Sequence, residues 1–184
     1  MKKLVLFMAA GLLSLVSVGQ VYAVNPSTHI AVPSQGAAWT LANTFGDWQL
    51  VCTEQGDKSC RALQTLDLEQ GEQSMRLLEV MVFYAGDQAR MNMTFPLGLD
   101  LLAGIVLKVD ENDEIGLPFS TCLADGCRVI GNIGDDVMAQ LMAGNVMKVG
   151  FRGFGEEQTL VLDVSLRGSA SAFRAAEARP VAVN

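Results

Sequence analysis

The sequence predicts a mainly β protein whose strands pair antiparallel in a sandwich or a small barrel. After residue 45, apolar and polar residues alternate along much of the chain, as at residues 160–166, and this period of two is typical of half-buried strands. Turn-forming pairs such as Gly86-Asp87 and Asp125-Gly126 separate the apolar runs. Many short strands joined by such turns favour an antiparallel all-β fold.

Individual elements follow from this pattern. The segment near residues 74–84 is apolar on both faces, which predicts a central strand. One helix is expected to begin at Asp135 and Asp136, whose negative charge suits the positive end of a helix, and to end before Gly144. A second helix is expected at about residues 169–178, anchored by Phe173. The expected strands lie near residues 47–53, 60–68, 74–84, 89–95, 102–109, 115–122, 127–133, 145–152 and 158–167.

The N-terminus has the pattern of a secretory signal peptide. Two lysines precede an apolar run, and small residues ending at Ala23 offer a cleavage site. The following segment is rich in proline, serine, threonine, alanine and glycine, so it is expected to be flexible, although Trp39 and Leu41 could dock it. The predicted organisation is a signal peptide at 1–23, a flexible arm at 24–44, a β-sandwich domain at 45–178 and a C-terminal tail at 179–184.

Charge and hydropathy limit the partners of the exported chain. Removal of the signal takes two of the 13 basic residues and leaves all 20 acidic ones. An acidic surface argues against nucleic acid as a partner, because nucleic acid requires a basic footprint. No apolar stretch after residue 24 is long enough to span a membrane. The longest candidate, residues 96–109, is interrupted by Asp100 and Lys108 and is assigned to the core.

Four cysteines, Cys52, Cys60, Cys122 and Cys127, remain after signal removal, and an even count in an exported chain indicates disulfides. Local pairing of the first two and of the last two is favoured, because a polar loop and a tight hairpin lie between the partners. A zinc site with four thiolates is disfavoured, since seven residues separate the first pair. Neither spacing is that of a redox C-x-x-C pair.

Catalytic chemistry has few candidates in this sequence. The single histidine, His29, falls in the expected arm, so no rigid Ser-His-Asp or Cys-His arrangement is expected. We therefore expect no enzyme, no catalytic residue and no cofactor. The alternative is a carboxylate-based enzyme or metal-binding protein that uses the acidic region from Asp110 to Glu114. A solvated turn is favoured there, because Ile115 stands where a calcium-binding EF-hand loop needs glycine.

The nine methionines are interpreted mainly as core residues. Methionine is flexible and fills gaps between strands. The alternative is a methionine-lined groove for partner proteins or for Cu(I), and Met91 and Met93 are the closest-spaced candidates.

The order of short motifs resembles the invasion-associated locus B family of exported bacterial proteins. The resemblance covers roughly residues 45–173, and one departure is Ser169, where the family usually has an apolar or aromatic residue. The motifs are Gly46-Asp47-Trp48, Cys52 and Cys60, Pro96-Leu97-Gly98, the hairpin from Cys122 to Cys127, Ala143-Gly144, and Val164-Ser165-Leu166-Arg167-Gly168 followed by Phe173.

The resemblance implies an immunoglobulin-like antiparallel β-sandwich with one short inserted helix and a short C-terminal helix. It also implies a periplasmic, secreted or outer-membrane-associated protein, and some members are linked to entry into host cells. The family supplies no catalytic residue and no ligand. We therefore expect a non-enzymatic binding or scaffold module of the cell envelope, whose partner is another envelope protein or a host protein.

Overall fold

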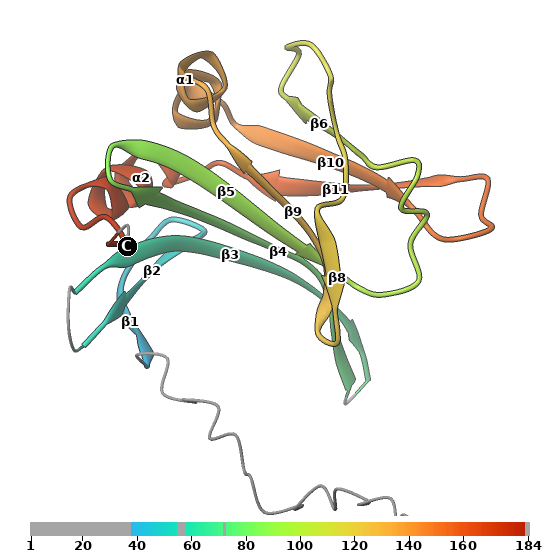
Figure 1. Ribbon diagram of the computed structural model, residues 1–184, viewed down its shortest axis with the longest axis horizontal. Helices are drawn as coiled ribbons and strands as arrows, with labels where there is room; N and C mark the ends of the chain where they lie inside the picture. The colour runs from blue at the N-terminus through green and yellow to red at the C-terminus, as the bar shows by residue number, and fades with distance from the viewer. Residues whose placement is uncertain (1–37, 55–57, 72, 183–184) are drawn as a thin grey trace, which may run out of the picture. The chain divides into compact units, whose positions relative to one another are not determined.

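Two antiparallel sheets form the protein in a computed structural model, which describes residues 38–54, 58–71 and 73–182. The large sheet has the strand order β1-β2-β3-β4-β5-β9-β8, and the small sheet has the order β11-β10-β6-β7 (Figure 1). Two helices follow β9 and β11. The elements are β1 (Trp39–Phe45), β2 (Trp48–Thr53), β3 (Cys60–Gln70), β4 (Gln73–Ala85), β5 (Gln88–Phe95), β6 (Ile105–Val109), β7 (Ile115–Leu117), β8 (Thr121–Leu123), β9 (Gly126–Asn132), α1 (Asp135–Ala143), β10 (Val146–Arg152), β11 (Thr159–Ser165) and α2 (Ser169–Glu177).

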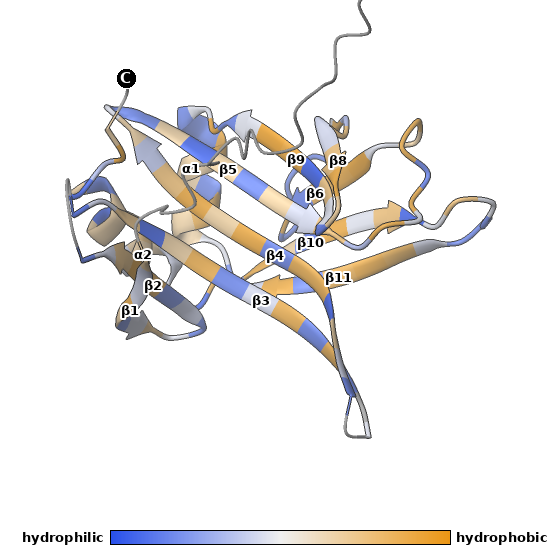
Figure 2. Cartoon of the chain, turned by 60° about the horizontal axis from the view of Figure 1, so that its bottom comes forward, coloured by the Kyte–Doolittle hydropathy of each residue, from blue (hydrophilic) through white to orange (hydrophobic). Residues whose placement is uncertain are grey.

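The core lies between the large sheet and a second layer formed by the small sheet and α2. Polar and apolar residues alternate along β3 and β5 (Figure 2), and fully and partly buried residues alternate along β4, so one face of the large sheet is buried. Phe95 of β5 packs edge-on against Phe151 of β10, with ring centroids 5.1 Å apart. Trp48 of β2 packs in the same way against Phe173 of α2, at 4.9 Å. These aromatic pairs join the two layers.

The expected β-sandwich is confirmed, and so are several of its elements. The strand that is apolar on both faces is β4, and it lies in the middle of the large sheet. Both helices lie at the residues that the sequence pattern predicts. Phe173 is fully buried, as an anchor of α2 should be.

The flexible arm was predicted to extend to residue 44, and this boundary was wrong, because residues 39–45 form β1. This strand pairs antiparallel with β2, and its backbone groups therefore have partners. The guanidinium of Arg61 lies 3.8 Å from the ring centre of Trp39, which holds the first residue of the strand on the sheet. The expected signal peptide and the arm as far as residue 37 lie outside the described residues.

The strand expected at 115–122 is divided into β7 and β8. Pro118 follows β7, and proline has no N–H with which to continue a ladder. The chain leaves the small sheet at this point and enters the large sheet. The strand expected at 102–109 begins only at Ile105, because Gly104 turns the chain at a φ of +66°.

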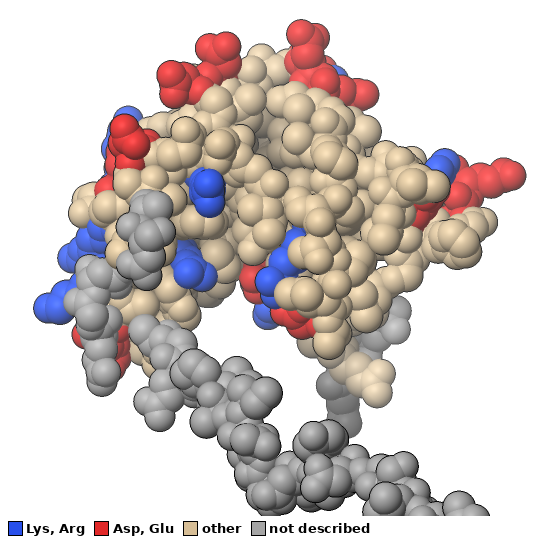
Figure 3. Space-filling model, in the orientation of Figure 1, with Lys and Arg blue, Asp and Glu red and all other residues tan. Residues whose placement is uncertain are grey.

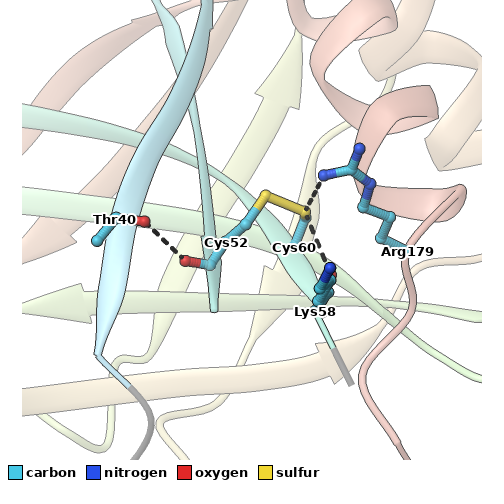
Figure 4. Close-up of a disulfide and its surroundings, with 5 residues drawn as sticks. All are labelled: Thr40, Cys52, Lys58, Cys60 and Arg179. Atoms are coloured by element: carbon cyan, nitrogen blue, oxygen red, sulfur yellow. Dashed lines mark hydrogen bonds between the residues drawn. A yellow bond between two sulfur atoms is a disulfide. The ribbon is translucent and has the colours of Figure 1, made fainter. Parts of the chain in front are cut away.

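Both disulfides have the local pairing that the sequence favours. Cys52 bonds to Cys60 between adjacent strands β2 and β3, and Cys122 bonds to Cys127 between β8 and β9. The first disulfide also contacts the C-terminal segment (Figure 4), where the Arg179 guanidinium lies 3.8 Å from the Cys60 sulfur. The backbone N–H of Cys60 donates to the carbonyl of Arg179 at 2.9 Å. The chain after α2 is therefore fastened to the large sheet.

Candidate interaction surface

Two loops pair at one end of the sandwich. The β5–β6 loop, residues 96–104, and the β10–β11 loop, residues 153–158, lie toward the right of Figure 1. The N–H of Phe154 donates to the carbonyl of Gly98, and the N–H of Asp100 donates to the carbonyl of Arg152, both at 2.9 Å. These bonds make the two loops one structural unit.

An ion pair reinforces this unit. The Arg152 guanidinium donates to the Asp100 carboxylate at 2.6 Å, and the N–H of Ala103 donates to the other oxygen at 3.3 Å. The hydrogen bond from Arg152 lowers the pKa of Asp100 below its usual value, with smaller help from the backbone N–H of Ala103. Leu99 packs against the core. The β5–β6 loop is thus held at Leu99 by packing and at Asp100 by hydrogen bonds.

The remaining large side chains of these loops face solvent, and we call them the apolar tip. Leu102 is 100% exposed and Phe154 is 80% exposed. Exposing a leucine or phenylalanine instead of burying it forgoes about 1.5–3 kcal/mol for each side chain. Exposed apolar side chains gathered in one place are typical of interaction surfaces. The apolar tip consists of Leu97, Leu101, Leu102 and Phe154.

Charge around the apolar tip is acidic. Glu156 and Glu157 follow Phe154 in the β10–β11 loop and are exposed. Figure 3 shows acidic side chains over this loop at the right of the view. The adjoining strand β11 is the edge of the small sheet and exposes Leu160 and Val161. An edge strand offers unpaired backbone groups to another chain, so apolar and main-chain contacts are available side by side.

The acidic region from Asp110 to Glu114 has a different role. The Asp110 carboxylate accepts hydrogen bonds from the backbone N–H groups of Val146 at 2.9 Å and of Asn145 at 3.0 Å. These bonds, that of Val146 first, hold the pKa of Asp110 below its usual value. Glu111, Asp113 and Glu114 are exposed. Asp110 therefore secures the junction of β6 and β10.

Residues 38–54, 58–71 and 73–182 contain no group of three or more histidine, cysteine, aspartate or glutamate side chains placed to hold a metal ion. His29 lies outside the described residues. Met91 and Met93 lie on the buried face of β5.

The sequence interpretation missed the apolar tip. The assignment of residues 96–109 to the core is right for Ile105, Leu107 and Val109, and Leu99 also packs against the core. It is wrong for Leu97, Leu101 and Leu102, which are exposed. The available signal was the spacing of Gly98, Asp100 and Gly104, since turn-forming residues around Leu101 and Leu102 indicate a loop.

No helix in the described part of the chain combines the length and the apolar character needed to cross a membrane.

Comparisons with known proteins agree in the family that they indicate. A family model described as "Invasion associated locus B (IalB) protein" matches residues 48–177. Two proteins named as invasion protein B homologs, from Brucella abortus strain 2308 and from biovar 1 strain 9-941, are each 29% identical over 150 residues. The match covers 82% of this chain and 87% of each relative.

A solved structure shows the same fold. The crystal structure of invasion associated protein b from Bartonella henselae aligns with a TM-score of 0.64 and 27% sequence identity. The alignment covers 76% of this chain and 97% of that chain. Because the family model spans most of the domain, from the start of β2 to the end of α2, the chain belongs to the invasion-associated locus B family.

Proposed function

We propose that this chain is an exported protein of the cell envelope that acts as a non-enzymatic binding module. Two disulfides fit an oxidising compartment outside the cytoplasm, and residues 1–23 have the pattern of a signal peptide. The relatives are named for invasion, so a host protein or another envelope protein is the proposed partner. Asp110 supports the non-enzymatic role, because its carboxylate already accepts two backbone N–H groups.

The apolar tip is the observation on which this proposal depends. Its loops are held by the Asp100–Arg152 ion pair and by hydrogen bonds between their backbones, so the exposed side chains are presented on an ordered support. A preorganised surface loses less conformational entropy when it binds. The exposed glutamates beside Phe154 favour a partner with an apolar groove bordered by lysine or arginine.

Crosslinking in intact cells tests the proposal. A photoreactive amino acid replaces Ala103, next to Leu102, in the tagged full-length chain, and captured proteins are identified by mass spectrometry. One reproducible partner is expected. Combining Leu102→Ser with Phe154→Ser should remove it, because the two side chains supply most of the exposed apolar surface of the tip.

The matched control is Leu123→Ser, which removes an exposed leucine from the β8–β9 hairpin instead. It should leave capture unchanged. If the Leu102 and Phe154 substitutions left the captured species unaltered, or if Leu123→Ser removed it equally, the apolar tip would not be the binding surface.

A further inference from the structure

The strand β4 is apolar on both of its faces, and the core covers only one of them. Val80 points into the core and is fully buried, whereas Met81 and Phe83 alternate with the buried positions and point outward. The small sheet lies on the inner side, and both helices pack against the core there, through Leu141 and Phe173 (Figure 1). A strand that is apolar on both faces is typical of a sheet covered on both sides.

Five apolar side chains follow the outer face of the large sheet, and we call them the outer stripe. Leu63 of β3 lies directly across from Met81. Met75 is 53% exposed, and the other four side chains are half-buried. None of the five belongs to the hydrophobic core or packs against it. Apolar side chains gathered on an outer face are typical of an interaction surface. The outer stripe consists of Leu63, Met75, Leu77, Met81 and Phe83.

The backbone beneath the outer stripe is already paired, which excludes the addition of a strand. β4 is paired with β3 on one side and with β5 on the other, so it offers no free row of backbone groups. An occupant must cover the side chains themselves, as an amphipathic helix does on an apolar surface. The outward positions from Met75 to Phe83 extend over about 26 Å, which is the length of a helix of about 18 residues.

Two arginines stand on either side of one end of the outer stripe. Phe83 is paired with Arg61 of β3 on one side and with Arg90 of β5 on the other. The Arg61 guanidinium lies 5.6 Å from the centre of the Phe83 ring. Arg90 is exposed and donates to the Asn132 side chain at 3.1 Å, and none of the ion pairs among the described residues involves it. This end of the stripe favours carboxylates on the occupant.

One carboxylate lies within the outer stripe, and it already has a cation beside it. Glu79 occupies an outward position in the middle of β4 and accepts from Arg76 at 2.7 Å. On the neighbouring strand β5, the outward positions after Arg90 are the uncharged Asn92 and Thr94. The positive charge of this face therefore lies at one end of the stripe, although the chain as a whole has 20 acidic and 13 basic residues.

We propose that the outer stripe docks an amphipathic helix of a partner protein, with apolar side chains over the stripe and carboxylates beside Arg61 and Arg90. A second copy of this chain would bring its own arginines against these two, so self-association through this face is disfavoured. The carbonyl end of a helix carries partial negative charge, and it should lie at the arginine end of the stripe. The surface is separate from the apolar tip and gives the protein a second site for a protein partner.

Titration with two synthetic peptides tests the proposal. Each has about 18 residues and forms a helix with leucines along one face. Glutamates occupy the polar face of the first peptide, and lysines that of the second. The methyl resonances of the methionines are followed by NMR at about 0.15 M salt, which screens the net negative charge of the protein. The glutamate peptide should shift Met75 and Met81 and bind at least roughly fivefold more tightly than the lysine peptide. Met147, fully buried in the core, should not shift.

Variants of the apolar side chains locate the binding surface. Leu77→Ser with Met81→Ser removes the middle of the outer stripe and should abolish binding of the glutamate peptide, with Met75 as the reporter. The matched control is Val106→Ser with Val161→Ser, because both valines are exposed on strands of the small sheet. This control should bind the peptide like the wild type. Thermal melts verify that both variants are folded.

A charge reversal tests the preference for carboxylates separately. Arg90 is exposed, so Arg90→Glu should fold like the wild type and bind the lysine peptide more tightly than the glutamate peptide. Arg174→Glu reverses an exposed charge on α2. It is the control and should keep the preference of the wild type.

Several results would overturn the proposal. One is unshifted Met75 and Met81 at the highest soluble concentration of the glutamate peptide, and another is equal affinity for both peptides. A dimer in sedimentation that Leu77→Ser with Met81→Ser dissociates would assign the face to a second copy instead. Binding to phosphatidylglycerol vesicles that the same variant loses would assign it to a bilayer. Leu102→Ser with Phe154→Ser should leave peptide binding unchanged, so failure of this proposal is distinguishable from failure of the apolar tip.

Discussion

The guanidinium of Arg167 forms an ion pair with the carboxylate of Asp47, which lies 120 residues earlier in the chain. Arg167 Nε lies 3.1 Å from Asp47 Oδ2, and the Ser165 hydroxyl donates to the same oxygen at 2.6 Å. In return, the N–H of Asp47 donates to the carbonyl of Arg167 at 3.0 Å. The contact joins the β1–β2 turn of the large sheet to the end of β11 in the small sheet.

The glycines beside these residues allow the two turns to touch. A Cβ at Gly46 would overlap the carbonyl of Arg167, and a Cβ at Gly168 would overlap the carbonyl of Phe45. Both glycines have positive φ values, +58° and +91°. The Gly-Asp-Trp motif and the Ser-Leu-Arg-Gly motif are therefore two halves of one structural junction.

The Asp47–Arg167 pair predicts a specific pH dependence of stability. Hydrogen bonds from Arg167 first and then Ser165 lower the pKa of Asp47 to about 2, below the value of about 3.9 in an unfolded chain. A lowered folded-state pKa contributes stability that is complete above about pH 4 and is lost as the pH falls toward 2. Asp47→Asn should thus lower the melting temperature at pH 7, by a difference that shrinks between pH 4 and pH 2.

Thermal melts followed by circular dichroism from pH 7 to pH 2 measure this difference. Asp87→Asn, which changes an exposed carboxylate in the β4–β5 turn, is the control and should melt like the wild type throughout. A difference for Asp47→Asn that stayed constant down to pH 2 would show that the carboxylate charge is not what stabilises the junction.

The hairpin disulfide predicts a second loss of stability. Cys122 and Cys127 close a loop of six residues including the cysteines, for which the chain-entropy model gives about 2 kcal/mol. Cys127→Ser, made together with Cys122→Ser to avoid a free thiol, should lower the free energy of unfolding by about that amount. Urea denaturation of the oxidised proteins measures it. Identical midpoints would mean that the bond does not stabilise the hairpin.

The Trp48–Phe173 contact predicts the largest effect of a single substitution. Both rings are fully buried, and they join α2 to the large sheet. Phe173→Ala should therefore destabilise the fold by about 3–5 kcal/mol, through lost burial and an unfilled cavity. Arg174→Ala, at the exposed neighbouring position, should change stability by less than about 0.5 kcal/mol. A small effect of Phe173→Ala would show that α2 is not anchored through this ring.

Most of the sandwich was predictable because its strands have one buried face. The buried Met147 and Val149 flank the exposed Lys148 in β10, and such a period appears directly in the sequence. The strand β1 was missed because its exposed Leu41 has no such period around it. β1 is extended because it pairs with β2, and strand pairing is not visible in a local sequence pattern.

The apolar tip was much less predictable. Leu102 reads as a core residue in the sequence, since its exposure depends on the pairing of two loops about 50 residues apart. This exposure is not local in sequence, so composition and spacing could supply the residues but not their arrangement.

Ser169, the first residue of α2, predicts a further test. Its side-chain hydroxyl donates at 2.8 Å to the carbonyl of Leu141, which is in the last turn of α1, and both residues are buried. Removal of the hydroxyl leaves that carbonyl unsatisfied, so Ser169→Ala should cost about 1–3 kcal/mol in urea denaturation. Ser171→Ala, on the exposed face of α2, should be neutral. If both substitutions were neutral, the hydrogen bond would not link the helices, and packing around Phe173 alone would hold α2.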